Sequence, residues 1–326
     1  MVKMPAAHYI IKRLIQIFPV VIGMITLIFI LIHLAPGDPI TYFTGESNVD
    51  PQMIAMLRER FGLNRPLIEQ YSIYLTRLLQ GDLGYSFVHG APVVQIVLET
   101  MPNTLLLIVS GYAFATLVGI FLGAESARKP YSKTDKIVIF ISLIAYSIPG
   151  FLTGFVLIYV FSYLLGWLPM TGMVTVTGSS TGIGYVIDLL RHLALPAIAF
   201  GAYHLAFVTR LTRGSVLEAL SQDYITTARS KGLSKNAIIY KHALRNALLP
   251  VTTVVGLDIS YNVGGAIIIE TLFSWPGVGR LMFNGITDRD YPLLLGSFFF
   301  LAIAVVLIQL FVDILYTYLD PRIRYK

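Results

Sequence analysis

The sequence predicts an all-α membrane protein with six transmembrane helices and both termini in the cytoplasm. Of its 326 residues, 56% are hydrophobic and 13% are charged, whereas a soluble domain carries about 25% charged residues. The mean hydropathy is +0.72. A soluble fold cannot cover that much apolar surface, so part of the solvent around this chain must be lipid.

Six apolar blocks are long enough to cross a bilayer core, which takes about 20 residues per helix. The third block is interrupted by Ser147-Ile148-Pro149-Gly150, and the proline predicts a kink there. The first block follows a basic segment but lacks a small-x-small cleavage site, so we expect it to remain as the first span. The blocks cover about 14–34, 104–123, 137–165, 193–211, 248–269 and 293–316.

The distribution of positive charge predicts the orientation of these spans. Most of the 24 Lys and Arg residues lie at the two ends of the chain and in the connections after the second and fourth blocks. By the positive-inside rule these segments face the cytoplasm. The net charge of +6 forms no basic patch on a polar domain, so we expect no nucleic-acid partner. The domain organisation is then 1–35 with the first span, 36–101 as an extracytoplasmic loop, and 102–326 as the transmembrane domain.

The outer segment at 36–101 is patterned rather than a simple linker. Asp50-Pro51 is an N-cap followed by a first-turn proline, which predicts a short helix over 52–61. A second helix is predicted over 70–79 and ends at Gln80-Gly81-Asp82. This segment is either a folded cap that joins two spans or a docking surface for an extracytoplasmic partner.

The inner segment at about 212–247 combines positive charge with apolar residues at helical spacing. Tyr224, Ile225 and Ala228 fall on one face before Gly232, and Ser234 can cap a second helix. Two short amphipathic helices fit a membrane surface or the groove of a partner protein. They are joined at Gly232, where we expect a left-handed or otherwise special backbone, which glycine adopts most easily. The alternative is a basic loop held by anionic lipid headgroups.

The chain contains no pattern that would predict an enzyme. It has no phosphate-binding G-x-x-x-x-G-K-[ST], no H-E-x-x-H and no G-x-S-x-G. Its six histidines do not pair at metal-ligand spacing, and it has no cysteine. We therefore expect no catalytic residue, no metal site and no cofactor site in this chain.

Asp258 and Asn262 are unusual because they lie in the fifth apolar block. They are four residues apart and therefore share a helix face. An ionisable group at this depth is costly unless it faces protein or water. Either the two residues line a substrate path, or they form a hydrogen bond between helices of the bundle. The single polar residues Tyr146, Ser147, His204 and Asp313 are expected to be structural.

Motifs along nearly the whole length together resemble one family. They include Leu34-Ala35-Pro36-Gly37-Asp38-Pro39, Gly81-Asp82-Leu83-Gly84-Tyr85-Ser86, Met101-Pro102-Asn103-Thr104-Leu105 and Asp320-Pro321-Arg322. The inner segment Asp223–Leu233 resembles the cytoplasmic EAA loop of ABC importers, with Thr226 and Thr227 replacing its Glu and first Ala. In this order and spacing, the chain resembles the membrane permease subunit of an ABC importer of the dipeptide, oligopeptide and nickel group.

The resemblance implies roles for particular residues. An ATPase-coupling loop would be formed by Tyr224, Thr226, Thr227, Ala228, Arg229, Lys231, Gly232, Leu233, Ile238, Leu244 and Arg245. Candidates for the translocation path are Asp258, Asn262, Ser147 and Pro149. An extracytoplasmic family motif comprises Glu270, Pro276, Gly277, Gly279, Arg289 and Asp290.

The resemblance also implies partners and a cargo. The partners would be a homologous second permease, two cytoplasmic ATPase subunits that bind the ATP and magnesium, and an extracytoplasmic solute-binding protein, all at the cytoplasmic membrane. The expected cargo is a di- or oligopeptide, with oligosaccharides, nickel complexes and glutathione as alternatives. A different class, an ion-gradient transporter or a membrane assembly factor, stays open. Internal inverted repeats would favour the gradient transporter.

Overall fold

The structure is a computed structural model that describes residues 6–34, 51–60, 62–86, 88–176, 178, 181–262 and 266–319. The residues 36–50 of the outer loop lie outside this range. The described residues are mostly helical, with one two-stranded antiparallel sheet among them. Contacts divide the chain into two compact units. The first holds Thr104–Trp275 with Ile308–Lys326, and the second holds Val2–Asn103 with Pro276–Leu307.

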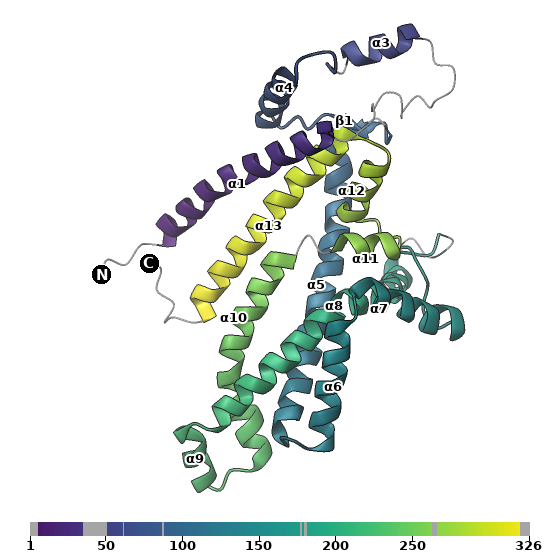
Figure 1. Ribbon diagram of the computed structural model, residues 1–326. Helices are drawn as coiled ribbons and strands as arrows, with labels where there is room; N and C mark the ends of the chain where they lie inside the picture. The colour runs from purple at the N-terminus through teal and green to yellow at the C-terminus, as the bar shows by residue number, and fades with distance from the viewer. Residues whose placement is uncertain are drawn as a thin grey trace. The chain divides into compact units, whose positions relative to one another are not determined.

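The first unit is a helical bundle arranged around one long helix, α8 (Gly182–Leu220). This helix packs against α6, α7, α10 and α11 (Figure 1). Most of α5 (Val93–Arg128) also belongs to this unit. The remaining elements are α6 (Lys133–Ser147), α7 (Gly150–Leu157), the π-helical turn η1 (Ile158–Leu164), α9 (Asp223–Ser230), the π-helical turn η2 (Ala237–Ala243), α10 (Leu244–Asn262) and α11 (Ile267–Leu272).

The predicted kink in the third apolar block is confirmed. The helical segments 133–147 and 150–164 meet at an angle of 107°. Ile148 is extended, with φ −84° and ψ 125°, because the residue before a proline is driven out of the helical region. Pro149 then stands at the N-cap of α7. The break therefore results from one local sequence feature.

Glycines allow α5 and α8 to approach each other closely. A Cβ on Gly111 would lie 2.6 Å from the Cδ1 atom of Phe200, and a Cβ on Gly123 would lie 2.6 Å from the carbonyl oxygen of Thr209. Both positions exclude any larger residue unless the helices move apart. Close packing of this kind is the usual way in which helices associate in lipid, where burial of apolar surface supplies little driving force.

The second unit pairs the first and last helices of the chain. Ile28, Phe29 and Ile32 of α1 (Ala6–Leu34) are buried against Leu294 and Leu295 of α13 (Tyr291–Leu319), and these helices lie alongside each other in Figure 1. The unit also holds α3 (Pro51–Arg60), α4 (Leu67–Leu79), α12 (Val278–Thr287) and the strands β1 (Tyr85–Ser86) and β2 (Ala91–Pro92).

The two short helices predicted in the outer segment are confirmed as α3 and α4. Gly62 follows α3 with φ of +69°, a left-handed conformation that ends a helix and favours glycine. The α4 helix contributes Tyr71 and Tyr74 to the packing around α1. Whether this segment docks a partner stays open.

Within the described residues, three helices are long and apolar enough to cross a membrane. They are 93–128, 182–220 and 291–312, which correspond to the second, fourth and sixth predicted spans. Counting the bent pair 133–147 and 150–164 as one span makes four. The chain is therefore a helical protein with several membrane spans, and the count of six stays a prediction.

Candidate functional sites

The inner segment expected at about 212–247 contains α9, a tight turn and η2. Gly232 follows α9 with φ of +74°. Its N–H donates to the carbonyl of Arg229 at 2.9 Å, and the N–H of Leu233 donates to the carbonyl of Ala228 at 3.3 Å. This is a left-handed helix ending, where glycine avoids the strain that a Cβ imposes. The special backbone predicted at Gly232 is confirmed.

The second half of the segment begins at Ser234, as predicted. The N–H of Ala237 donates to the Ser234 hydroxyl at 3.3 Å, and the N–H of Ile238 donates to the Ser234 carbonyl at 3.0 Å. The side chain thus satisfies a backbone donor that the start of a helix would leave unpaired. The π-helical turn η2 then continues directly into α10.

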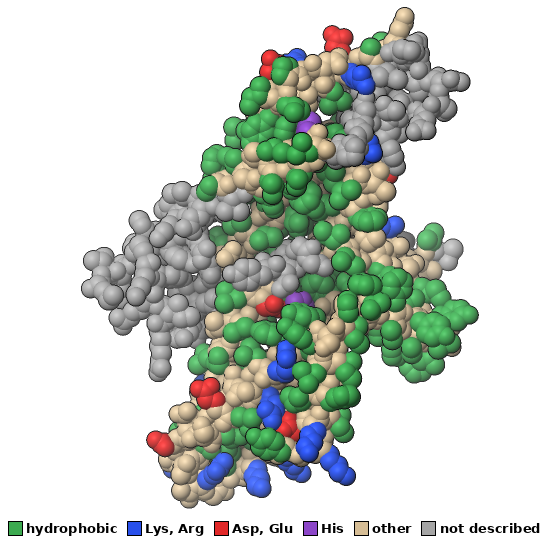
Figure 2. Space-filling view, viewed as in Figure 1, with side chains coloured by type: hydrophobic (Ala, Val, Ile, Leu, Met, Phe, Trp, Pro, Cys, Tyr) green, Lys and Arg blue, Asp and Glu red, His purple; other side chains and the backbone are tan. Residues whose placement is uncertain are grey.

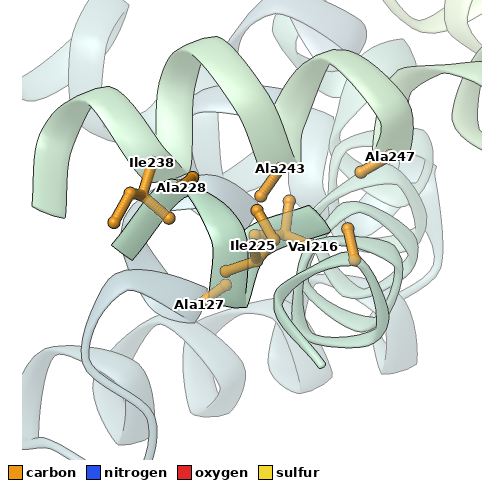
Figure 3. Packing of buried hydrophobic residues seen from close by; sticks show 8 residues of the cluster. Ala127, Val216, Ile225, Ala228, Ile238, Ala243 and Ala247 are labelled. Carbon is orange, nitrogen blue, oxygen red and sulfur yellow. The ribbon is translucent and has the colours of Figure 1, made fainter. Parts of the chain in front are cut away.

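A hydrophobic cluster anchors this segment to the rest of the bundle (Figure 3). Ile225 is fully buried in it, which contributes about 2 kcal/mol by removal of apolar surface from water. The cluster draws on α5, α8, α9, η2 and α10, so α9 is tied to several helices at once. Its members are Ala127, Val216, Ala219, Ile225, Ala228, Ile238, Ala243 and Ala247.

This packing corrects two expectations from the sequence. Ala228 and Ile238 are each 6% exposed, so they are covered by the chain's own helices and are not available to enter a partner's groove. Tyr224 is 38% exposed and does not share the buried face of Ile225 and Ala228. The buried stripe of α9 consists of two residues at i, i+3 spacing, and Tyr224 lies beyond its edge.

The outward surface of the segment is polar and positively charged. Arg229, Lys231 and Leu233 are exposed, and Leu233 adds an apolar side chain at 39% exposure. Figure 2 shows Lys and Arg side chains gathered at the end of the first unit that carries α9. We call the exposed members of the predicted coupling loop around α9 the α9 surface. They are Tyr224, Thr226, Thr227, Arg229, Lys231, Gly232 and Leu233, with Arg245 exposed and Leu244 half-buried after η2.

A buried ion pair that no sequence pattern predicted lies at the α5–α6 turn. Asp135 is 3% exposed. It accepts hydrogen bonds from the Arg213 Nε (2.7 Å), the Arg213 Nη2 (2.8 Å), the Tyr131 N–H (2.7 Å) and the Ser126 hydroxyl. The only sequence signal was Ser132-x-x-Asp135, which matches a helix start, and Ser132 does cap α6. The distant partner Arg213 left no local signal.

Tyr240 of η2 makes a second polar contact at this end of the bundle. Its hydroxyl donates to a carboxylate oxygen of Glu125 near the end of α5. Burial, followed by this hydrogen bond, raises the pKa of Tyr240 above its ordinary value, so the phenol stays protonated and remains a donor. The contact links the π-helical turn to α5 in addition to the hydrophobic cluster.

Asp258 joins three helices of the first unit. Its Oδ2 atom lies 2.6 Å from the His204 Nδ1 of α8. The Tyr112 hydroxyl of α5 donates to the Asp258 carbonyl at 3.0 Å and lies 3.3 Å from the carboxylate. The rings of Tyr112 and His204 are 4.5 Å apart. This arrangement supports the helix–helix hydrogen bond as the role of Asp258 in this conformation.

The other candidates for the translocation path do not share this network. The hydroxyl of Ser147 donates to the carbonyl of Leu143 in its own helix at 2.8 Å and is exposed. Pro149 is exposed at the bend. Asn262 ends α10, but its side chain lies outside the described residues. Their role in a path stays a prediction.

The outer motif residues are built into the fold. Glu270 of α11 is fully buried and accepts a hydrogen bond from the Thr104 hydroxyl at 2.7 Å. The N–H of Trp275 donates to the Glu270 carbonyl at 2.8 Å. A carboxylate so enclosed stabilises the bundle only while its partners remain in place, because an unpaired buried charge is costly.

In the second unit, the same motif shapes the start of α12 and α13. Gly277 is the N-cap of α12, and Gly279 is buried in its first turn. The Pro276 carbonyl accepts from the Asn103 amide at 2.8 Å. Asp290 accepts hydrogen bonds from the Ser86 hydroxyl and from the N–H groups of Val88 and Leu293. Arg289 adopts φ of +53° just before α13.

Comparisons with known proteins agree with this architecture. A family model described as the binding-protein-dependent transport system inner membrane component matches residues 115–325. A model for the N-terminal part of such membrane components matches residues 6–108. The dipeptide transport system permease protein DppB of Alkalihalophilus pseudofirmus is 42% identical over 97% of this chain and 99% of its own length. The oligopeptide transport system permease protein AppB of Bacillus subtilis is 41% identical over 98% of this chain and 100% of its own length.

A solved structure of an amino acid ABC transporter with histidines is similar in fold. It superposes with a TM-score of 0.50 at 13% identity, over 71% of this chain and 95% of that chain. At that identity the likeness concerns the fold alone. The two family models together span most of the sequence, and the relatives match it nearly end to end. The chain belongs to the family of binding-protein-dependent transport system inner membrane components.

Proposed function

We propose that this chain is a permease subunit of an ATP-driven ABC importer and that its cargo is a short peptide. The observation that carries the cargo class is the identity of 41–42% over at least 97% of the chain to permeases named for dipeptide and oligopeptide transport. Similarity over this length supports a common cargo class better than a shared fold does, because one fold hosts many functions.

We infer that the chain crosses the membrane six times, with both termini in the cytoplasm of a bacterial or archaeal cell. The charge distribution supports this orientation, and the end of the first unit that carries α9 is rich in Lys and Arg (Figure 2). The α9 surface would then face the cytoplasm, whereas α3 and α4 would lie outside. The importer would be completed by a second permease, two ATPase subunits that hold ATP and magnesium, and an extracytoplasmic binding protein.

In this proposal, the α9 surface is the contact for an ATPase subunit. Its backbone is held by the buried cluster around Ile225, while Thr226, Thr227 and Arg229 remain exposed. Because α9 is packed against several helices on one side, a displacement of α9 by an ATPase would move those helices with it. Movement of the ATPases would rock the bundle between inward-facing and outward-facing states. The chain itself then performs no chemistry.

Reconstitution of the importer in liposomes tests this proposal. This chain would be co-expressed with a second permease, ATPase subunits and a binding protein of such importers from the same organism. Uptake of a labelled dipeptide would then be measured with and without ATP. We expect ATP-dependent uptake that an unlabelled tripeptide inhibits and that an oligosaccharide or a nickel complex does not. A permease that purifies without a P-loop ATPase and transports with an ion gradient alone would contradict the proposal.

A further inference from the structure

Arg210 places a positive charge in the apolar part of α8, at the end of the block 193–211. A charged side chain in a span must face protein, water or a ligand. In the described part of the chain no carboxylate pairs with Arg210, and its Nε atom is buried without a hydrogen-bond partner. Its neighbour Arg213, one turn along the helix, is paired with Asp135. Among the described residues, Arg210 therefore has a guanidinium with no paired carboxylate.

One exposed tyrosine contacts this guanidinium, and a second tyrosine stacks on the first. The Cζ atom of Arg210 lies 4.4 Å from the centre of the Tyr146 ring, a cation–π contact that holds the side chain in place. The ring of Tyr203 stacks on the same Tyr146 ring at 4.8 Å, and the two hydroxyl oxygens are 3.4 Å apart. Both tyrosines are 40% exposed. The cluster thus joins the partly exposed Arg210 to two exposed tyrosines whose hydroxyl oxygens are close together.

The nearby carboxylate is already occupied. Tyr203 also contacts the ring of His204 edge-on, at 5.4 Å, and His204 holds Asp258 at 2.6 Å. The Tyr112 hydroxyl lies within 3.3 Å of the same carboxylate. The anion of this region is therefore satisfied inside the bundle, whereas the cation of Arg210 is not. The remaining positive charge of Arg210 favours an anionic ligand.

The depth of the cluster favours a cargo over a lipid headgroup. Tyr146 is next to the last residue of α6, which has 15 residues and is about 22 Å long. The opposite end of α6 is the charged turn that holds Asp135. The Cα of Tyr146 therefore lies about 17 Å along the helix from that of Asp135, and Arg210 reaches its ring from a position one turn before Arg213 on α8. Phosphate headgroups lie outside a hydrocarbon core of about 30 Å, so a headgroup at the charged end of α6 would be closer to Arg213 than to the Tyr146 ring.

We infer that Arg210, Tyr146 and Tyr203 form a subsite on the translocation path that binds the α-carboxylate of a passing peptide. This inference rests on the proposed peptide cargo. A guanidinium binds a carboxylate through two parallel N–H···O bonds, and a tyrosine hydroxyl can donate a third. The ligand class is a peptide with a free C-terminus. Its binding must be weak enough to release the cargo, since transport requires both entry and exit.

The test compares two probes of equal size in the complete importer reconstituted in liposomes. One probe is a labelled dipeptide with a free carboxylate, and the other is the same dipeptide as its C-terminal amide. The kcat/KM of uptake is measured for both, in wild type, Arg210→Met and Arg210→Lys. The same binding protein serves all variants, so its own preference cancels when the acid-to-amide ratio of each variant is divided by that of wild type.

We expect Arg210→Met to lower the acid-to-amide ratio roughly 10-fold, as expected for the loss of a charge-assisted hydrogen bond. Arg210→Lys keeps the charge but not the bidentate geometry, so its acid-to-amide ratio should lie between those of wild type and Arg210→Met. Tyr203→Phe should lower the ratio less. The matched control is Tyr163→Phe in the exposed stacked pair Tyr159–Tyr163, and it should leave the ratio unchanged.

Three outcomes would overturn the inference while peptide import stands. An unchanged acid-to-amide ratio in Arg210→Met would show that Arg210 does not bind the peptide carboxylate. An equal loss of uptake for both probes, with poor recovery of the assembled complex, would show that Arg210 acts in packing or in contact with a partner subunit. An effect that appears only in vesicles containing phosphatidylglycerol, with the ratio unchanged, would assign it to a lipid phosphate. Failure of wild type to import either probe would instead reject the peptide cargo and the subsite together.

Discussion

Arg213 and Asp135 form a two-point ion pair between α8 and the start of α6, with Nε–Oδ1 at 2.7 Å and Nη2–Oδ2 at 2.8 Å. The Asp135 side chain is almost fully enclosed, so the attraction acts in a medium that screens it weakly. Because Ser126 and Tyr131 bond to the same carboxylate, the pair also fixes the α5–α6 turn. It determines how that turn lies against α8.

Removal of Arg213 should therefore destabilise the bundle strongly. Arg213→Met leaves the buried carboxylate of Asp135 without its counter-charge, which costs roughly 3 kcal/mol. The measurement is the thermal unfolding midpoint of the purified importer in detergent. Arg128→Met is the control, because the Arg128–Glu125 pair is longer (3.4 Å) and partly exposed and should contribute less than about 1 kcal/mol. Equal shifts for the two variants would contradict the structural role.

A substitution at Gly232 should separate transport from folding. Gly232→Asp forces a residue with a Cβ into φ of +74°, at a cost of about 1 kcal/mol. A Cβ there meets no atom of this chain within 4 Å, so the protein should still insert and assemble. Uptake and cargo-stimulated ATP hydrolysis should both fall, because the α9 surface is disturbed.

Gly182 supplies a matched control for this prediction. It has φ of +76° and equally open surroundings, but it starts α8 in the predicted outer segment. Gly182→Asp should therefore carry the same backbone penalty and retain stimulated ATP hydrolysis. If Gly232→Asp showed wild-type uptake and hydrolysis, the α9 surface would not be the coupling element and the lipid-bound loop would be favoured.

Asp258→Asn should weaken the contact of α10 with α5 and α8. The variant keeps an acceptor for Tyr112 but removes the charge that His204 faces, so we expect a loss of roughly 1 kcal/mol in stability. The readout is the unfolding midpoint together with uptake of several dipeptides. Ser147→Ala is the control, because its hydroxyl bonds only within its own helix. Altered dipeptide preference at unchanged stability would instead place Asp258 on the path.

Cysteine labelling tests the six-span topology, since the natural chain contains no cysteine. A membrane-impermeant maleimide added to intact cells should label the new thiol of Glu69→Cys in α4. It should leave Lys235→Cys, at the start of the helix after Gly232, unlabelled until the cells are opened. Labelling of position 235 from outside would reject the orientation.

Local features of this protein could be predicted from the sequence alone. The apolar blocks indicated the long helices, since a helix that crosses lipid must be apolar along its whole length. Pro149 predicted the bend, Ser234 predicted a helix start, and Gly232 predicted the left-handed ending. Each depends on the conformational preference of one residue and its immediate neighbours, and so leaves a signal within a few positions.

The partners of the polar residues were decided only by the tertiary structure. Nothing near Asp258 in the sequence indicates His204, and nothing near Asp135 indicates Arg213. Periodicity placed Ala228 and Ile238 on apolar faces but did not reveal that the chain covers those faces itself. Which side chains meet depends on how closely helices pack, and the glycines of α5 and α8 set that distance through contacts between residues far apart in the sequence.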